Sequence, residues 1–217
     1  MKTYVSASIL SADFSKLESE ISRAEKSGVD MIHFDVMDGV FVDNISFGVP
    51  VLKSIKKCTS LPFDVHLMID NPVKYVRDFA LAGADIITFH AEAQSNIKET
   101  IDKIHSFGIK AGISVKPDTP MESIFEYMNS IDLVLIMTVE PGFGGQGFID
   151  STLEKISSAR KYLNENNISA FLQVDGGINS ITAKKVIDAG ADNLVSGSYL
   201  FCSDNFSDAV KSLKLGL

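Results

Sequence analysis

The feature that most constrains the fold of this chain is a short sequence joint that occurs repeatedly. It reads SGVDMIHFD at 27–35, AGADIITFH at 82–90 and AGADNLVSG at 189–197, and FGIKAGISV at 107–115 is a looser copy. The close copies place a small residue, a glycine, a small or β-branched residue and an aspartate before an apolar run. This order is typical of a helix that ends at a glycine and is followed by a tight turn and a buried strand. The repeats therefore predict alternating strands and helices with parallel strand pairing.

Eight units of this kind can be counted along the chain. The predicted strands lie at 4–9, 30–36, 62–68, 85–90, 109–115, 132–138, 170–175 and 192–197. The predicted helices lie at 15–27, 48–57, 95–106, 151–164, 180–188 and 205–214, with two more that start near 71 and 119. Eight β/α units in 217 residues are typical of a closed (β/α)8 TIM barrel, and the count disfavours an open doubly wound sheet. We expect residues 1–217 to form one α/β barrel as a single catalytic domain, because no linker or low-complexity segment marks a second domain.

Residues with capping chemistry predict where three helices start. Ser15 and Glu18 have the spacing of a capping box. Asn71 precedes Pro72, which predicts an N-cap followed by proline at the first helical position. The stretch Thr119–Glu122 repeats this pattern and predicts a further helix start.

Composition and charge indicate a cytoplasmic protein that binds neither nucleic acid nor membrane. The formal net charge of −8 gives no basic surface for an anionic polymer or bilayer. No apolar run approaches the ~18 residues of a membrane span, and the first residues are too polar for a signal peptide. Cys58 and Cys202 lack metal-binding spacing, so we interpret both as reduced structural thiols.

Polar side chains gather at the predicted C-terminal ends of the strands, which form the catalytic face of a (β/α)8 barrel. His33 and Asp35 lie two residues apart and therefore share one face of the second strand. His66 ends the third strand, and Asp175 ends the seventh, roughly across the barrel mouth from the second. We predict that these four side chains bind one divalent metal ion. Two histidines and two carboxylates suit Zn²⁺, Fe²⁺, Mn²⁺ or Co²⁺, whereas Mg²⁺ or Ca²⁺ would prefer more oxygen ligands.

Glycine-rich loops follow the sixth, seventh and eighth predicted strands. EPGFGGQGF at 140–148 is compatible with a plain flexible turn, a mobile lid, or backbone amides that reach an anion. The pairs GG at 176–177 and GS at 197–198 favour an anion site, because the loops after strands seven and eight form the usual phosphate site of this fold. Backbone amides can hold a phosphate without arginine, so an acidic chain can still bind a phosphorylated ligand.

A metal ion, two opposed carboxylates and a phosphate site together indicate epimerisation of a phosphorylated ketose. The metal would polarise the substrate carbonyl and stabilise an enediolate. Asp35 and Asp175 would exchange a proton with opposite faces of the adjacent carbon, each acting as base in one direction and acid in the other. Ser8, at the end of the first strand, is expected to hydrogen-bond the substrate or a metal ligand.

Several residues near the strand ends have two interpretations. Met37, Met68 and Met137 could fill the core or form a polarizable wall of the active site. His90 and Glu92 could support the metal ligands or have an ordinary structural role.

Six segments resemble the ribulose-phosphate 3-epimerases over nearly the whole chain. They are SILSADF at 8–14, HFDVMDGVFV at 33–42, DVHLMI at 64–69, MTVEPGFGGQ at 137–146, VDGGIN at 174–179 and VSGS at 195–198. The resemblance implies a (β/α)8 barrel that interconverts D-ribulose 5-phosphate and D-xylulose 5-phosphate in the pentose phosphate pathway. It implies a divalent metal held by His33, Asp35, His66 and Asp175, with the two aspartates as the acid–base pair.

The resemblance also implies substrate contacts from strand ends and glycine loops. They are Ser8, His66, Gly142, Phe143, Gly144, Gly145, Gly176, Gly177, Gly197 and Ser198. We expect a homo-oligomer, and since the family includes different assemblies, no particular number of subunits is predicted. Asp43 stands where the family has proline, Gly147 where it has a longer residue, and Lys116 where many members have asparagine, so the loops that carry Asp43 and Gly147 are expected to be less rigid.

Four alternative functions can be compared with this prediction. The nearest, an allulose-6-phosphate 3-epimerase, has a similar fold and mechanism, but its lid tends to carry alanine at the position of Gly144. A related barrel lyase would need lysine in the pattern D-x-K-x-x-D, which residues 33–38 lack. A Schiff-base aldolase would need lysine at the position of Met137, so only Lys116 supports that idea. A sugar-phosphate sensor with an inactive site is disfavoured, because both histidines and both aspartates are present.

Overall fold

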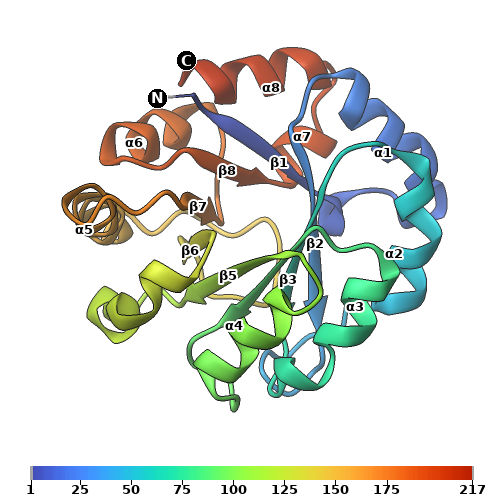
Figure 1. Cartoon of the computed structure of the whole chain (residues 1–217). Coiled ribbons are helices and arrows are strands. Elements are labelled where there is room, and N and C mark those ends of the chain that lie inside the picture. The colour runs from blue at the N-terminus through green and yellow to red at the C-terminus, as the bar shows by residue number, and fades with distance from the viewer. Residues whose placement is uncertain (1, 217) are drawn as a thin grey trace.

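The computed structural model describes residues 2–216 and contains a closed barrel of eight parallel strands surrounded by helices (Figure 1). The strands pair in sequence order, and β8 pairs with β1 to close the barrel. Their bounds are β1 Tyr4–Ser8, β2 Met31–Met37, β3 Phe63–Met68, β4 Ile86–His90, β5 Lys110–Val115, β6 Leu133–Met137, β7 Phe171–Asp175 and β8 Asn193–Ser196. The predicted barrel is confirmed, and each strand boundary lies within one residue of its predicted position.

Helices cover the outside of the barrel (Figure 1). The α-helices are α1 Leu17–Lys26, α2 Val49–Ile55, α3 Val76–Ala82, α4 Ile97–His105, α5 Thr152–Glu165, α6 Ser180–Ala189, α7 Ser198–Phe201 and α8 Phe206–Leu215. Short 3-10 helices are η1 Ile9–Ser11, η2 Phe14–Lys16, η3 Lys56–Cys58 and η4 Pro72–Lys74. The connection between β5 and β6, for which the sequence predicts a helix, is the longer 3-10 helix η5, Met121–Ser130.

The repeated joint has a direct structural explanation in its glycines. Gly28, Gly83 and Gly190 have φ values of 86°, 109° and 113°, in the left-handed region that favours glycine. Gly83 and Gly190 are the C-caps of α3 and α6. Each glycine therefore turns the chain from a helix into the next strand, as the sequence predicts.

The aspartate of each joint anchors a neighbouring strand. Asp30, Asp85 and Asp192 accept hydrogen bonds from backbone N–H groups of the first or second residue of adjacent strands, at Val5 (2.9 Å), Phe63 (2.8 Å) and Leu172 (2.9 Å). Each aspartate also pairs with a basic side chain, namely Lys214, Lys56 and Arg160 respectively. The joints thereby satisfy backbone donors at the N-terminal rim of the barrel.

The predicted capping box at Ser15 and Glu18 is wrong. Asp13 is the residue that caps this region, because its Oδ1 accepts a 3.0 Å bond from the Ser15 backbone N–H at the start of η2. The chain is therefore already in a helical turn when α1 begins, and Lys16 at its N-cap makes no capping bond from its side chain.

The other two predicted caps also have different partners. Asn71 is the N-cap residue of η4 and Pro72 is its first residue, as predicted, but Asn71 Oδ1 accepts a 3.2 Å hydrogen bond from Ser95 Oγ and makes no capping bond. The Thr119 hydroxyl donates to Glu92, and Pro120 occupies the N-cap position of η5. In both cases the polar side chain that was expected to cap a helix forms a hydrogen bond with a residue more than 20 positions away in the sequence.

The inside of the barrel contains an apolar cluster and a set of buried polar side chains. On β2, Ile32, Phe34 and Val36 belong to the cluster that packs against the helices, whereas alternate residues point into the barrel. The interior apolar cluster comprises Met31, Ile86, Leu133, Leu135, Met137 and Val139, packed against Phe171. Polar side chains occupy interior positions toward the C-terminal ends of the strands, where the candidate site lies. None of the helices within residues 2–216 has the length and apolar character needed to cross a bilayer.

Candidate active site

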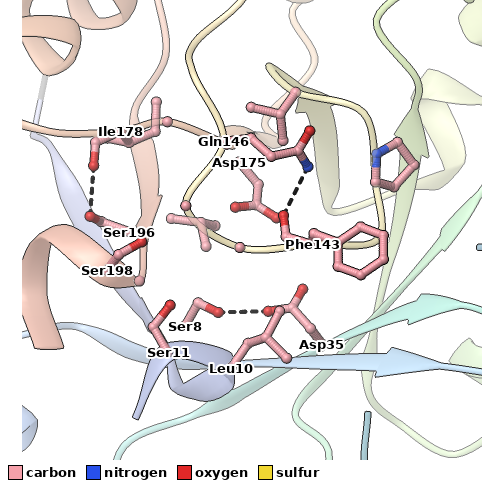
Figure 2. A pocket seen from close by; sticks show the side chains of 18 of the residues that line it. Ser8, Leu10, Ser11, Asp35, Phe143, Gln146, Asp175, Ile178, Ser196 and Ser198 are labelled. Atoms are coloured by element: carbon pink, nitrogen blue, oxygen red, sulfur yellow. Dashed lines mark hydrogen bonds between the residues drawn. The ribbon is translucent and has the colours of Figure 1, made fainter. Parts of the chain in front are cut away.

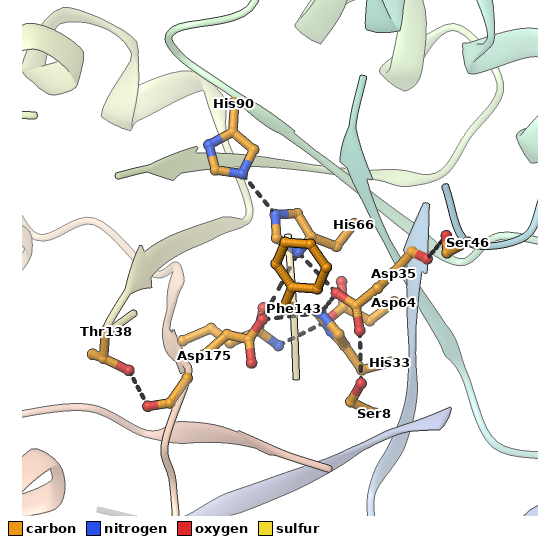
Figure 3. Close-up of polar contacts among 12 residues, drawn as sticks. Ser8, His33, Asp35, Ser46, Asp64, His66, His90, Thr138, Phe143 and Asp175 are labelled. Atoms are coloured by element: carbon orange, nitrogen blue, oxygen red, sulfur yellow. Dashed lines mark hydrogen bonds and ion pairs between the residues drawn. The ribbon is translucent and has the colours of Figure 1, made fainter. Parts of the chain in front are cut away.

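Strands β2, β3 and β7 bring the four predicted metal ligands together at the C-terminal mouth of the barrel (Figure 3). Asp35 and His66 are direct partners in the parallel register of β2 and β3. Asp35 Oδ1 lies 3.2 Å from both His33 Nε2 and His66 Nδ1. Asp175 Oδ2, from the far side of the mouth, lies 3.9 Å from the same two nitrogens. One ligand atom from each residue lies within 4.8 Å of every other, so a single ion could contact all four.

The chemistry of this group fits a metal ion. His33 Nε2 is a buried polar atom that has no hydrogen-bond partner of acceptable geometry among the described residues. Two carboxylates that face each other in a buried site repel unless positive charge lies between them. Two imidazole nitrogens and two carboxylate oxygens are donors that a borderline divalent ion accepts in tetrahedral or expanded geometry.

Asp64 and Gln173 support His33 from below, and sequence reasoning did not identify them. His33 Nδ1 lies 2.8 Å from Asp64 Oδ2, which also accepts a 2.6 Å bond from Gln173 Nε2. This contact directs Nε2 of His33 toward the carboxylates, as expected for a metal ligand oriented by a second carboxylate. The available signal was alternation, since Asp64 and Gln173 each lie two residues before a predicted site residue on the same strand face.

His90 and Glu92 support His66 from the side. Nε2 of His66 and Nε2 of His90 are 3.0 Å apart, and Nδ1 of His90 lies 3.1 Å from Glu92 Oε2. His90 is the last residue of β4 and is 1% exposed, so this contact is shielded from water. The positions of His90 and Glu92 therefore agree with the interpretation that they support a candidate metal ligand.

Burial and charge move the pKa values of the two aspartates in opposite directions. Burial, reinforced by repulsion from Asp35, raises the pKa of Asp175 to about 6. Burial also opposes ionisation of Asp35, but the adjacent His33 and His66 outweigh it and hold the pKa of Asp35 well below its usual range. In the metal-free protein, Asp35 is thus the ionised partner and Asp175 the one that carries a proton more readily.

A cavity of about 320 Å³ opens above the two carboxylates (Figure 2). Ser8 lines it and donates a 2.6 Å hydrogen bond to Asp35 Oδ2. Met37, Met68 and Met137 also line it, so they contribute to the wall as well as to the core. His33 and His66 are fully buried beneath the cavity floor.

The glycine-rich loops surround the other end of the cavity. All the glycines and neighbouring residues that the family resemblance implies lie along its wall: Gly142, Phe143, Gly144, Gly145, Gly176, Gly177, Gly197 and Ser198. A Cβ atom at Gly177, whose φ is 65°, would lie 2.6 Å from the Phe148 backbone nitrogen. The close approach of the chain to itself therefore requires glycine at this position.

The loop at 140–148 is held by side-chain hydrogen bonds. Gln146 Nε2 donates to the carbonyl oxygens of Glu140 (2.6 Å) and Phe143 (2.8 Å), and Asn44 Nδ2 donates to that of Gly142 (2.7 Å). Phe143 is 57% exposed at the rim of the cavity. These contacts give the loop a defined conformation, and its predicted mobility stays a prediction.

The charges around the cavity constrain how it could bind an anion. None of the described residues that line it is lysine or arginine. Lys116, the residue that kept a Schiff-base mechanism open, does not line it and places its Nζ 4.3 Å above the Phe41 ring. Ser11 and Tyr199 line the cavity close to the glycines and were not singled out from the sequence, although Ser11 lies in the segment SILSADF.

Comparisons with known proteins show the family of this chain. The model of the ribulose-phosphate 3 epimerase family matches residues 4–201. The chain is 48% identical over 212 residues to the chloroplastic ribulose-5-phosphate-3-epimerase of Arabidopsis thaliana, covering 97% of this chain and 75% of that protein. It is 46% identical over 211 residues to the ribulose-phosphate 3-epimerase of Bacillus subtilis, covering 97% of both chains.

Solved structures of lower identity share the fold. The 3-hexulose-6-phosphate synthase of Salmonella typhimurium superposes with a TM-score of 0.74 at 16% identity, covering 100% of this chain and 98% of that chain. KGPDC from Streptococcus mutans gives a TM-score of 0.76 at 12% identity, covering 99% of this chain and 96% of that chain. These similarities are to the barrel alone, whereas the family match and the close relatives extend along almost the whole sequence. The chain therefore belongs to the ribulose-phosphate 3-epimerase family.

Proposed function

We propose that this chain is a metal-dependent isomerase that interconverts D-ribulose 5-phosphate and D-xylulose 5-phosphate by epimerisation at carbon 3, a reaction of the pentose phosphate pathway. The observation that carries the proposal is the pair Asp35 and Asp175, which approach one buried site from β2 and β7 beneath a cavity. The names of the relatives at 46–48% identity support the same substrate.

The two carboxylates can perform the proton transfers of such a reaction. One takes the proton of carbon 3 from one face of the substrate, and the other returns a proton to the opposite face. The carbonyl stays at carbon 2, so only the configuration at carbon 3 changes. Because burial raises the pKa of Asp175 to about 6 while the nearby histidines keep Asp35 ionised, Asp175 is the member of the pair that takes up a proton more readily. The Ser8 hydroxyl fixes the orientation of the Asp35 carboxylate by donating to its Oδ2.

We assign His33, Asp35, His66 and Asp175 as the ligands of one divalent ion, with Zn²⁺, Fe²⁺, Mn²⁺ and Co²⁺ as candidates. When bound, this ion would supply Lewis-acid polarisation of the carbonyl and charge stabilisation of the enediolate. The walls formed by Met37, Met68 and Met137 exclude water from the plane of the reacting carbons.

We assign the phosphate of the substrate to the end of the cavity between the 142–145 loop and the turns at 176–177 and 197–198. Since no basic side chain lines the cavity in the described residues, backbone amides and hydroxyl groups such as that of Ser198 would hold it. With this assignment the phosphate lies away from the two carboxylates, and carbon 3 of the substrate lies between Asp35 and Asp175. The acidic metal site and the anionic end of the substrate are thereby kept apart.

The decisive experiment combines metal analysis with an epimerase assay before and after chelation. We expect about one divalent ion per subunit, loss of activity when it is removed, and recovery when it is restored. The same assay on D-allulose 6-phosphate tests the six-carbon alternative, and a higher kcat/KM on that substrate would replace the five-carbon assignment. Sedimentation of the purified protein would test the further proposal that it acts as a homo-oligomer of single-domain subunits.

A further inference from the structure

A row of hydrogen-bonding groups leads from the candidate ligand His66 through His90 to Glu92, and Figure 3 shows its first contact, between His66 and His90. Nε2 of His66 contacts Nε2 of His90 at 3.0 Å, and Nδ1 of His90 contacts Glu92 Oε2 at 3.1 Å. Glu92 Oε1 accepts from the Lys116 backbone N–H at 2.8 Å and from the Thr119 hydroxyl. Both imidazole side chains are buried, because His66 is 0% exposed and His90 is 1% exposed.

The direction of every hydrogen bond in this row follows from its outer end. Burial opposes ionisation of Glu92, but hydrogen bonds from His90, Lys116 and Thr119 outweigh it and lower the pKa of Glu92 to about 2, so the group is a carboxylate, which can only accept hydrogen bonds. The proton in the contact with Glu92 must therefore belong to Nδ1 of His90. A neutral His90 then presents an unprotonated Nε2 to His66, and the proton in that contact must belong to Nε2 of His66.

The consequence appears at the opposite nitrogen of the same ring. Nδ1 of His66 is the nitrogen that faces the candidate metal site. In the metal-free protein it is hydrogen-bonded to Asp35 Oδ1 at 3.2 Å and lies 3.9 Å from Asp175 Oδ2, so a divalent ion bound there would replace the proton of that hydrogen bond. A metal ligand must offer an unprotonated nitrogen, and a proton fixed on the other ring nitrogen achieves this. We infer that Glu92 and His90 are positioning residues that fix the tautomer of His66, so that its Nδ1 is kept available to a divalent ion.

This inference rests on the proposed metal site, and it goes beyond it by assigning roles to two residues outside the ligand set. Glu92 is itself held in place by a backbone segment at Lys116 that has its own side-chain contact. Lys155 of α5 donates from Nζ to the Lys116 carbonyl oxygen at 2.8 Å, which fixes the backbone segment that donates to Glu92. The row therefore ends on ordered backbone, not on mobile solvent-exposed chain.

The substitution Glu92→Gln would reverse the direction of the hydrogen bonds in this row, while the side chain keeps its size and shape. The glutamine oxygen would keep the Lys116 N–H as its donor, and its NH₂ group would then face Nδ1 of His90. His90 could accept that bond only with its proton on Nε2, and this proton would meet Nε2 of His66. Nε2 of His66 would then have to accept that bond, so the proton of His66 would lie on Nδ1, the nitrogen that faces the candidate metal site.

The test measures metal affinity and histidine tautomers in the same variants. Affinity for Zn²⁺ and Co²⁺ is measured by chelator competition, and ¹⁵N chemical shifts of the imidazole nitrogens report the tautomers in the metal-free protein at neutral pH. The chain has 4 histidines, so the ring signals can be assigned by single substitutions. We expect Glu92→Gln to move the His90 proton from Nδ1 to Nε2 and to weaken metal binding about 10–100-fold.

Glu122→Gln is the matched control, because it makes the same chemical change at an exposed residue of η5, away from the row. It should leave affinity and tautomers unchanged. If Glu92→Gln does not fold, His90→Phe replaces it, since it keeps a ring against Phe41, whose centroid lies 4.7 Å from that of His90, and removes the acceptor for His66. This variant should also weaken metal binding.

Two results would overturn the inference. One is weakened metal binding in Glu92→Gln with the His90 tautomer unchanged, which would show a merely structural role. The other is unchanged metal affinity in Glu92→Gln, or in His90→Phe where that variant is used. The experiment also separates this inference from the proposed function. If the wild-type protein binds no divalent ion, the metal site fails, whereas a wild-type His90 with its proton on Nε2 refutes the hydrogen-bond row alone.

Discussion

Asp35 and Asp175 approach the same two imidazole nitrogens from opposite sides of the barrel mouth. Asp35 Oδ1 lies 3.2 Å from His33 Nε2 and His66 Nδ1, and Asp175 Oδ2 lies 3.9 Å from both. Asp35 is 2% exposed, whereas the Asp175 side chain is 19% exposed and lines the cavity. Burial opposes ionisation of both carboxylates, but Asp35 lies closer to the two histidines, which hold its pKa low, whereas repulsion from Asp35 adds to burial and raises the pKa of Asp175.

Replacing either carboxylate by an amide should strongly slow epimerisation but leave proton exchange by the other carboxylate. We expect Asp35→Asn and Asp175→Asn each to lower kcat about 10²–10⁴-fold, the usual contribution of a positioned acid–base group. The carboxylate that is left can still take the carbon 3 proton from the epimer that faces it. In D₂O, each variant should then introduce deuterium into only one of the two epimers, and NMR of the recovered sugars would measure this.

Asp204→Asn, at an exposed position near α8, is the control for these variants and should behave as wild type. The metal content of every variant must be measured, because both aspartates are also proposed ligands. Deuterium incorporation into both epimers by one variant at a near wild-type rate would contradict a two-base mechanism.

Removal of the metal ion should lower stability as well as activity. A ligand that binds only the folded state adds about 2.7 kcal/mol when it is present at a hundredfold excess over its Kd. We therefore expect chelation to lower Tm, and each restored ion to raise it in the order of its affinity. Calorimetry of the metal-free and reloaded protein measures this shift. A Tm that is the same with and without chelator, in a protein shown to lose its ion, would place the ion outside the folded site.

The sequence predicts the barrel well, because its repeated joints encode local geometry. The glycine at each joint needs a left-handed φ, and the aspartate reaches a backbone N–H only one strand away. The four candidate metal ligands are predictable because they lie toward the C-terminal ends of strands whose positions in the barrel are known once the fold is known. Roles for these residues in catalysis stay predictions until they are tested.

Contacts between distant segments were not predictable in the same way. Asp64 meets Gln173 across the barrel at 2.6 Å, although 109 residues separate them in sequence. Thr119 has the spacing of a helix cap, yet its hydroxyl binds Glu92 from another β/α unit. Local patterns identify which residues can form hydrogen bonds, but only the closed barrel decides which partner each one meets.

Asp38 provides a test of stability as a function of pH. Its carboxylate accepts backbone N–H bonds from Val40 and Phe41 at 2.9 Å and from Asp70 at 2.8 Å. Burial opposes ionisation, but these bonds outweigh it and lower the pKa of Asp38 below its ordinary value of 3.8. The folded pKa is thus below the unfolded one, so the stabilisation is complete above pH 3.8 and is lost as pH falls through the folded pKa.

Asp38→Asn should therefore lower the free energy of unfolding at pH 7 by about 1–3 kcal/mol, as expected for bonds to a charged acceptor. The difference from wild type should shrink as the pH falls below 3.8. Urea unfolding of the metal-free proteins at several pH values measures both effects. Asp43→Asn changes an exposed carboxylate on the same loop and should have little effect at any pH. A cost for Asp38→Asn that does not vary with pH would show that charge is not its source.

Gly177 tests whether the turn after β7 holds the substrate phosphate. Its φ is 65°, and a Cβ there would lie 2.6 Å from the backbone nitrogen of Phe148. Gly177→Ala should cost about 1–3 kcal/mol in stability and push this turn away from the segment that leads into α5. Because the phosphate binds ground state and transition state alike, KM for ribulose 5-phosphate should rise more than kcat falls. Gly147→Ala is the matched control, since Gly147 has an ordinary φ and no atom within 4 Å of its Cβ position. If Gly177→Ala lowers kcat but leaves KM unchanged, the turn positions Asp175 and the phosphate binds elsewhere in the cavity.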